Sequence, residues 1–127
     1  MSNHFSPATL DAIARSHYLW IRGGDGDHRF LPIWSIVHGQ RLFIRSWNVK
    51  AGGWHEVLTK EKRGAIKVAR DAEPIPVRAI RIRSDRTKTI VDKGFAAKYT
   101  KPHSLKYVRG FRTARRRDAT FELVPLR

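Results

Sequence analysis

Five residues in one short stretch have side chains that suit the binding of a phosphorylated aromatic molecule: Arg45, Ser46, Trp47, Lys50 and Trp54. The guanidinium group of Arg45 can donate two parallel hydrogen bonds to a phosphate, and the Ser46 hydroxyl and the Lys50 ammonium add further donors. The indole rings of Trp47 and Trp54 can cover a planar ring system, because aromatic groups favour offset stacking. We therefore expect a cofactor pocket at this point of the chain.

His55 and Glu56 are the candidate catalytic residues, because a histidine changes its charge near neutral pH and can move protons. Adjacent residues on a helix point about 100 degrees apart, so an ordinary surface pair is the alternative interpretation. No two of the six histidines have the i, i+4 spacing of a helical metal pair, and the chain has no cysteine. We expect no metal site.

A β-hairpin within residues 29–56 is predicted to position these side chains. Its arms are residues 29–37 and 41–46, which are rich in aromatic and β-branched side chains. Gly39 supplies the turn, because glycine readily takes the positive φ of a tight hairpin. In the second arm Leu42 and Ile44 point to one face, and Arg41, Phe43 and Arg45 point to the other. One face of that strand should therefore be apolar and the other mixed.

Patterns elsewhere predict further strands and helices. The other strands are residues 17–22, 65–69, 75–83 and 119–124, and the helices are residues 7–16, 54–63 and 87–100. Short connections favour antiparallel pairing and closure into a barrel. The predicted fold class is α+β, mainly β with α: a small barrel of about six mostly antiparallel strands with two to three flanking helices, in one domain over residues 1–127. Trp34 is expected in its core more than in a cofactor pocket.

Charge is the most unusual feature of the composition. The formal net charge is +15 and the sequence pI is about 11.3, which predicts attraction to phosphate groups. Eight lysines and arginines, and no carboxylate, occur from Lys98 to Arg117. Such a run is either a mobile solvated segment or a nucleic-acid contact. No stretch has the length and apolarity of a membrane span or a signal peptide, so we expect a cytoplasmic protein without membrane contact.

The order of features also resembles a known superfamily. It runs through a strand ending in Pro-Ile-Trp at 32–34, a turn at Gly39, a strand ending in Phe-Ile-Arg-Ser at 43–46, and a helix that begins at Trp54. Later pieces are Phe-Ala-Ala-Lys-Tyr at 95–99 and Ala-Thr-Phe-Glu-Leu-Val-Pro at 119–125. In this order the chain resembles the flavin-binding split β-barrels, the pyridoxamine-phosphate-oxidase-like superfamily. Within it, the chain is similar to small bacterial proteins akin to the deazaflavin-dependent nitroreductases.

The resemblance implies a split barrel, commonly a homodimer, that binds FMN or a deazaflavin near the subunit interface and acts as an oxidoreductase. Arg45 and Ser46 match the strand end that approaches the cofactor, and Trp54 matches the aromatic residue that opens the next helix. Val57 stands where deazaflavin-binding relatives usually have asparagine. A cofactor-free enzyme or small-molecule binder that reuses the pocket is therefore a further possibility, and so is a nucleic-acid-binding module. For the cofactor-free protein we expect Arg45→Ala to abolish activity without unfolding the chain.

Overall fold

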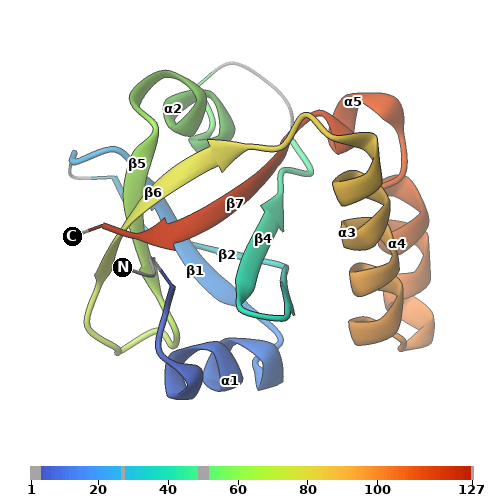
Figure 1. Cartoon of the computed structure of the whole chain (residues 1–127), viewed down its shortest axis with the longest axis horizontal. Coiled ribbons are helices and arrows are strands. Elements are labelled where there is room, and N and C mark those ends of the chain that lie inside the picture. Colours follow the sequence, from blue (N-terminus) through green and yellow to red (C-terminus); the bar gives the residue numbers. More distant parts are fainter. Residues whose placement is uncertain (1–3, 27, 49–51, 127) are drawn as a thin grey trace.

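The computed structural model describes residues 4–26, 28–48 and 52–126, and in these ranges seven strands form one antiparallel sheet. The strand order is β2-β1-β5-β6-β7-β4-β3, and the sheet curls into a nearly closed barrel (Figure 1). The strands are β1 (Leu19–Gly23), β2 (Leu31–Ile33), β3 (Ser35–His38), β4 (Arg41–Arg45), β5 (Arg63–Lys67), β6 (Ile75–Arg81) and β7 (Thr120–Pro125). The predicted α+β barrel is confirmed, with seven strands in place of six.

Helices cover both ends and one side of this barrel. They are α1 (Pro7–Arg15), α2 (Trp54–Glu61), α3 (Asp85–Lys98), the 3-10 helix η1 (Pro102–Ser104), α4 (Leu105–Gly110) and α5 (Ala114–Arg117). In Figure 1, α1 and α2 lie at opposite ends of the barrel, and α3, α4 and α5 form a layer beside it. The Ser6 and Ser84 hydroxyls cap α1 and α3 by accepting the amide hydrogens of Thr9 and Thr87. No helix in the described ranges is long and apolar enough to cross a membrane.

The extra strand arises because residues 29–37 form two strands where one was predicted. The break lies at Trp34. Strand β2, before it, pairs with β1, whereas β3, after it, pairs with β4. Pro32 within β2 has no amide hydrogen to donate, which fits the position of β2 at an edge of the sheet. The prediction of a single continuous arm was therefore wrong. The turn predicted at Gly39 is confirmed, with φ of 63°.

Strand β4 is buried on both faces. Leu42 and Ile44 lie in the core inside the barrel, and Phe43 on the opposite face lies in a second core against α3 and α4. The expected mixed face is thus largely covered, because the layer of helices packs onto it. Residues 98–117, predicted to be either a mobile solvated segment or a nucleic-acid contact, contribute η1, α4 and α5 to this layer, and most of their basic side chains are exposed.

Helix α2 and strand β5 are shifted from their predicted bounds. The helix ends at Glu61, because Lys62 takes a left-handed conformation with φ of 62° that the helix cannot continue through. As a result β5 begins at Arg63, two residues before the predicted position 65. The start of α2 at Trp54 agrees with the sequence prediction.

Candidate ligand-binding site

A cavity of about 640 Å³ opens where five parts of the chain meet. These parts are the segment between α1 and β1, the bend between β2 and β3, the end of β4, the start of α2, and the η1–α4 segment. Its walls are mainly aromatic, and the aromatic wall residues include Tyr18, Trp34, Trp47, Trp54, Tyr107 and Phe111. The volume lies within the range of small-molecule sites, about 300–1,000 Å³. A planar ligand could be enclosed between these side chains.

Four of the predicted cofactor residues line this cavity, namely Arg45, Ser46, Trp47 and Trp54. Lys50 lies outside the described residues. The Ser46 side chain is buried, and its hydroxyl donates to the carbonyl oxygen of Asn48 at 2.9 Å. The hydroxyl oxygen can therefore only accept a further hydrogen bond, whereas a phosphate would require a donor.

Trp47 is held in place by residues of α4 and α5. The guanidinium carbon of Arg116 lies 3.6 Å from the centroid of an indole ring of Trp47, and its Nε donates to the Trp47 carbonyl at 3.0 Å. The same arginine donates from Nη1 to the carbonyl of Gly110 at 3.1 Å. A Cβ at Gly110 would lie 2.7 Å from Cζ3 of Trp47 and closer still to Cη2. The indole therefore fits because position 110 has no side chain.

The donors of Arg45, the predicted phosphate ligand, are engaged within the protein. Its side chain is buried and turned toward the helices. Its Nε donates to Oγ1 of Thr120 at 2.7 Å, and its Nη1 donates to Oδ1 of Asp92 at 2.6 Å and to the carbonyl of Phe111 at 3.1 Å. Its Nη2 donates to the carbonyl of Lys88 at 3.2 Å. The bidentate fork is thus occupied by protein acceptors, because α3 carries Asp92 to the end of β4.

Burial and charge act in opposite directions on Arg45. Burial lowers the pKa of its guanidinium group, and the hydrogen bond and negative charge of Asp92 raise it. Arg117 donates to the second carboxylate oxygen of Asp92 at 3.1 Å. Arg45, Asp92 and Arg117 therefore form one ion-pair network that joins β4 to α3 and α5.

His55 and Glu56 do not line the cavity. The His55 ring lies against Phe121, with ring centroids 6.0 Å apart, and burial together with the positive charges of Arg81 and Arg115 lowers its pKa. Glu56 instead accepts from the amide of Gly52 at 3.4 Å and pairs with Lys60 at 3.6 Å. The two side chains contact different neighbours, although the negative charge of Glu56 opposes the lowering of the His55 pKa, and their catalytic role stays a prediction.

Several residues of the cavity were not identified as site residues from the sequence. Trp34, expected in the core, packs against the second core and also lines the cavity, where its ring stacks on Tyr99 at 3.9 Å between centroids and 4° between planes. His17 and His103 also line the cavity. They lie far apart in the sequence, so no spacing pattern connects them. Within the described ranges, no cluster of three or more histidine, aspartate or glutamate side chains could hold a metal ion.

Comparison with solved structures finds a similar fold in the conserved hypothetical protein Rv2991 from Mycobacterium tuberculosis. The TM-score is 0.56 at 15% sequence identity, and the alignment covers 99% of this chain and 83% of that chain. Among curated proteins, none matches significantly. Residues 9–123 match the DUF2255 family, which is described as uncharacterised proteins conserved in bacteria. The chain therefore belongs to the DUF2255 family.

Proposed function

We propose that the protein binds a planar, phosphorylated small molecule of the flavin type in the aromatic cavity. The observation that carries this proposal is the convergence of Trp34, Trp47 and Trp54 on one cavity of about 640 Å³. They come from the β2–β3 bend, the end of β4 and the start of α2. Flat aromatic walls favour a flat aromatic ligand. The resemblance to flavin-binding split barrels adds FMN or a deazaflavin as the specific candidates.

An oxidoreductase activity is the activity that such a ligand would support. A bound flavin would supply the electron transfer, while the protein binds and orients it and excludes water. The aromatic walls of the cavity fit the ring system of that group. Arg45 would act at a distance, by holding the carbonyl of Phe111 and the end of β4 in position.

The test is to titrate the purified protein with FMN and with a deazaflavin, and to measure binding by the fluorescence of the cofactor. We expect micromolar affinity or better for one of them, and Trp34→Leu should weaken it about tenfold through the loss of one aromatic wall. Trp20→Leu is the matched control, because Trp20 belongs to β1 and does not line the cavity. If the folded protein binds neither molecule, the proposal fails. In that case a cofactor-free use of the cavity becomes the better description.

We also propose that a second copy of the chain covers the mouth of the cavity. Three aromatic or aliphatic side chains that line the cavity are widely exposed in the single chain: Tyr18 at 45%, Leu31 at 41% and Tyr107 at 40%. Such an apolar rim is costly to leave in water and suits burial in a homodimer. Light scattering should give twice the chain mass of 14.7 kDa, and Leu31→Asp should reduce it to the monomer. A monomeric wild-type protein would contradict this proposal.

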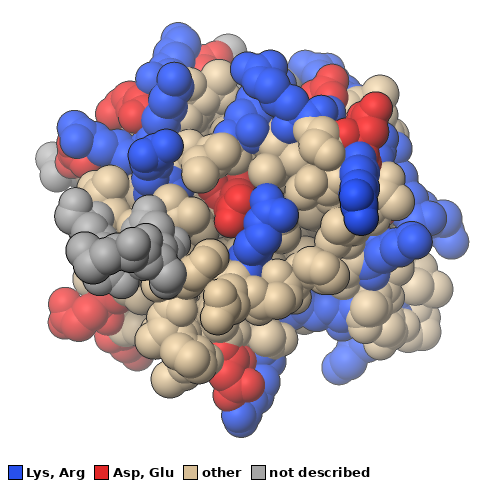
Figure 2. Space-filling model, in the orientation of Figure 1, with Lys and Arg blue, Asp and Glu red and all other residues tan. Residues whose placement is uncertain are grey.

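A second candidate function, nucleic-acid binding through residues 98–117, is favoured by the charge of the helical layer. Figure 2 shows lysine and arginine side chains distributed over much of the visible surface. Arg116 and Arg117 are engaged by protein acceptors, whereas the exposed basic residues of η1, α4 and the flanking turns remain on the surface: Lys101, Lys106, Arg109 and Arg112. Binding through them should weaken steeply with salt. A flat salt dependence would exclude it.

A further inference from the structure

We infer that the anionic group of the ligand is held at the rim of the cavity by His17, Lys101 and His103, and not at the end of β4. This inference rests on the proposed binding of a phosphorylated planar molecule in the same cavity. It assigns the phosphate to residues on the segment after α1 and on the segment that begins η1. Neither segment was part of the cofactor site expected from the sequence.

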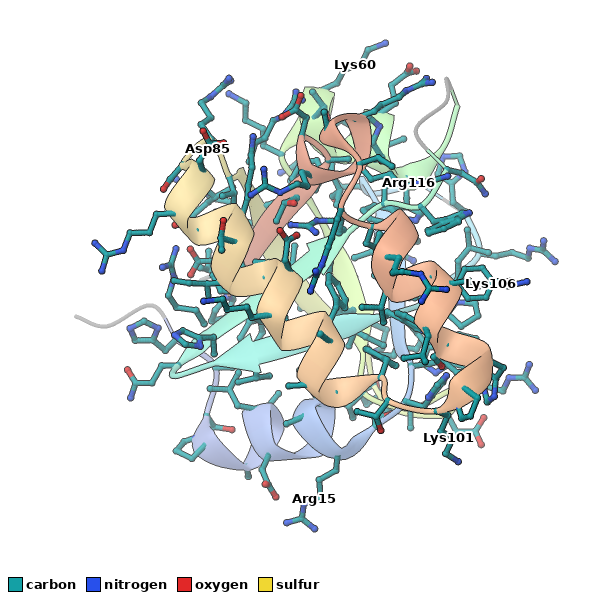
Figure 3. The ribbon with its side chains drawn as sticks, turned by 90° about the vertical axis from the view of Figure 1, so that its right-hand side faces the viewer. Arg15, Lys60, Asp85, Lys101, Lys106 and Arg116 are labelled. Carbon is teal, nitrogen blue, oxygen red and sulfur yellow. The ribbon has the colours of Figure 1, made fainter. Side chains whose placement is uncertain are left out.

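The three residues are brought together by a bridge between two distant segments. Tyr99, just after α3, donates its hydroxyl hydrogen to the carbonyl of His17 at 2.8 Å, and its ring meets the His17 ring with centroids 5.2 Å apart. Two residues later the chain reaches Lys101, and His103 follows in η1. Both histidines line the cavity; Lys101 is not among the lining residues, but its positive charge reaches His17 and lowers the pKa of that ring. Figure 3 shows Lys101 at the outer side of this segment. The bridge therefore fixes His17 next to the start of η1.

The local charge at this rim is positive and lacks a carboxylate. None of the cavity-lining residues is an aspartate or glutamate. Burial lowers the pKa of His17, and the positive charges of Lys98, His103 and Lys101 lower it further. The other groups that face His17 are uncharged aromatic rings, those of Tyr18, Trp34 and Tyr99. A bound anion would offset this repulsion between cations.

The side chains at the rim also have donors to spare. Among the described residues, the Lys101 and His103 side chains make no hydrogen bond or ion pair with another protein group. Arg45 and Arg116, which lie beside the same cavity, instead donate to protein carbonyls, a hydroxyl or a carboxylate. Burial of a phosphate among the aromatic walls would remove its hydration without supplying donors, whereas the rim supplies them. The rim is therefore the better place for the charged end and the interior for the ring.

The affinity for a phosphorylated ligand should then depend on pH through His17. An anion stabilises the protonated imidazole, so binding raises the low pKa of His17 and takes up a proton. The preference for a phosphorylated over an unphosphorylated ligand should increase as the pH falls from 8 toward about 6.5. A phosphate monoester itself titrates near pH 6. Measuring the same affinities over this pH range with a variant that lacks the histidine separates the titration of the phosphate from the titration of His17.

The experiment compares FMN with riboflavin, which share a ring system and differ in the phosphate. Wild-type protein should bind FMN about tenfold more tightly than riboflavin at pH 6.5, as expected for charge-assisted hydrogen bonds. The double variant His17→Gln/His103→Gln should lose most of this preference and its pH dependence. Lys101→Ala should reduce the preference in the same direction. His38→Gln is the control, because His38 is exposed beside the hairpin turn and does not line this cavity.

The outcomes separate this inference from the proposed function. If wild-type protein binds FMN and riboflavin equally at every pH, or if the double variant keeps the full preference, the rim site is wrong and flavin binding stands. If the folded protein binds neither flavin, nor a deazaflavin with or without its phosphate, both proposals fail. Where only a deazaflavin binds, its phosphorylated and dephosphorylated forms replace FMN and riboflavin in the comparison.

Discussion

Arg45 shows how a charged side chain can serve as a packing element. Its side chain is fully buried, and the guanidinium group joins β4 to α3 through Asp92, to α4 through the carbonyl of Phe111, and to β7 through Thr120. A buried ion pair contributes little over an apolar replacement of both partners, yet loss of one partner leaves the other charge uncompensated. This asymmetry decides what a substitution at position 45 should do.

We expect Arg45→Ala to lower the free energy of unfolding by about 3 kcal/mol or more, because Asp92 would lose its most buried partner. This differs from the earlier expectation of lost activity with an intact fold. Arg41→Ala on the same strand is the matched control. Arg41 pairs with Glu122, but its side chain is 42% exposed, so the loss should stay below about 1 kcal/mol. Urea unfolding followed by tryptophan fluorescence measures both, and equal losses would contradict the structural role of Arg45.

Two helices approach the sheet closely because each carries a glycine at the point of contact. A Cβ at Gly94 of α3 would lie 2.8 Å from Cδ1 of Ile36 in β3, and a Cβ at Gly110 of α4 would overlap the indole of Trp47. Glycine lowers the intrinsic stability of a helix by roughly 0.5–1 kcal/mol relative to alanine. The close packing of the helical layer offsets that cost. The position of Trp47 in the cavity is therefore set by α4 as much as by β4.

Gly110→Ala should displace Trp47 and reshape the cavity. Overpacking of this kind costs about 1–3 kcal/mol, and the affinity for the flavin should fall several-fold because one aromatic wall moves. Tryptophan emission and flavin titration report the two effects. Gly26→Ala, at an exposed turn where the added Cβ would meet only the His28 side chain, controls for the extra methyl group. Unchanged emission and affinity in Gly110→Ala would show that the indole does not depend on this contact.

Helices α1 and α3 are joined to the edge strand β3 at one point. The Lys98 ammonium donates to the carbonyl of Ile13 at 3.2 Å and to that of Ser35 at 2.8 Å. The adjacent Tyr99 hydroxyl accepts the amide hydrogen of Ser35 at 3.2 Å and donates to the His17 carbonyl. This cluster connects the end of α1, the start of β3 and the end of α3. The barrel, the N-terminal helix and the helical layer thereby become one packed unit.

Lys98 should make the free energy of unfolding depend on pH between about 8 and 10. Burial lowers its pKa from 10.5 to about 8, so the unfolded chain holds more protons than the folded chain between these values. The contribution of Lys98 to the free energy of unfolding must therefore rise with pH in this range. The free energy of unfolding of the wild type minus that of Lys98→Met should increase from pH 8 to pH 10.

The comparison with Lys98→Met removes the titration of groups that both proteins share. Tyr99, whose pKa is raised by burial, acts in the opposite direction at high pH but is present in both proteins. Lys93→Met, an exposed lysine on the same helix, controls for the loss of one positive charge. A difference that stays level or falls between pH 8 and pH 10 would show that Lys98 is not desolvated in the folded protein.

The sequence by itself determined the features that depend on neighbours along the chain. Alternation and Gly39 predicted the hairpin, side-chain patterns predicted helices at residues 7–16 and 87–100, and the number of short strands predicted a small antiparallel barrel. It also indicated the end of β4 and the start of α2 as walls of one cavity. These predictions hold because hydrogen bonds within turns and helix caps, and side-chain periodicity, are local properties.

Only the tertiary structure decided which partner each polar side chain meets. Arg45 had the chemistry of a phosphate ligand, but Asp92 and Thr120 occupy its donors once α3 and β7 pack beside β4. His17 and His103 had no recognisable spacing, yet the Tyr99 bridge brings their segments to the same rim. Such pairings depend on how whole elements pack, because side chains far apart in sequence meet only when the elements that carry them pack together.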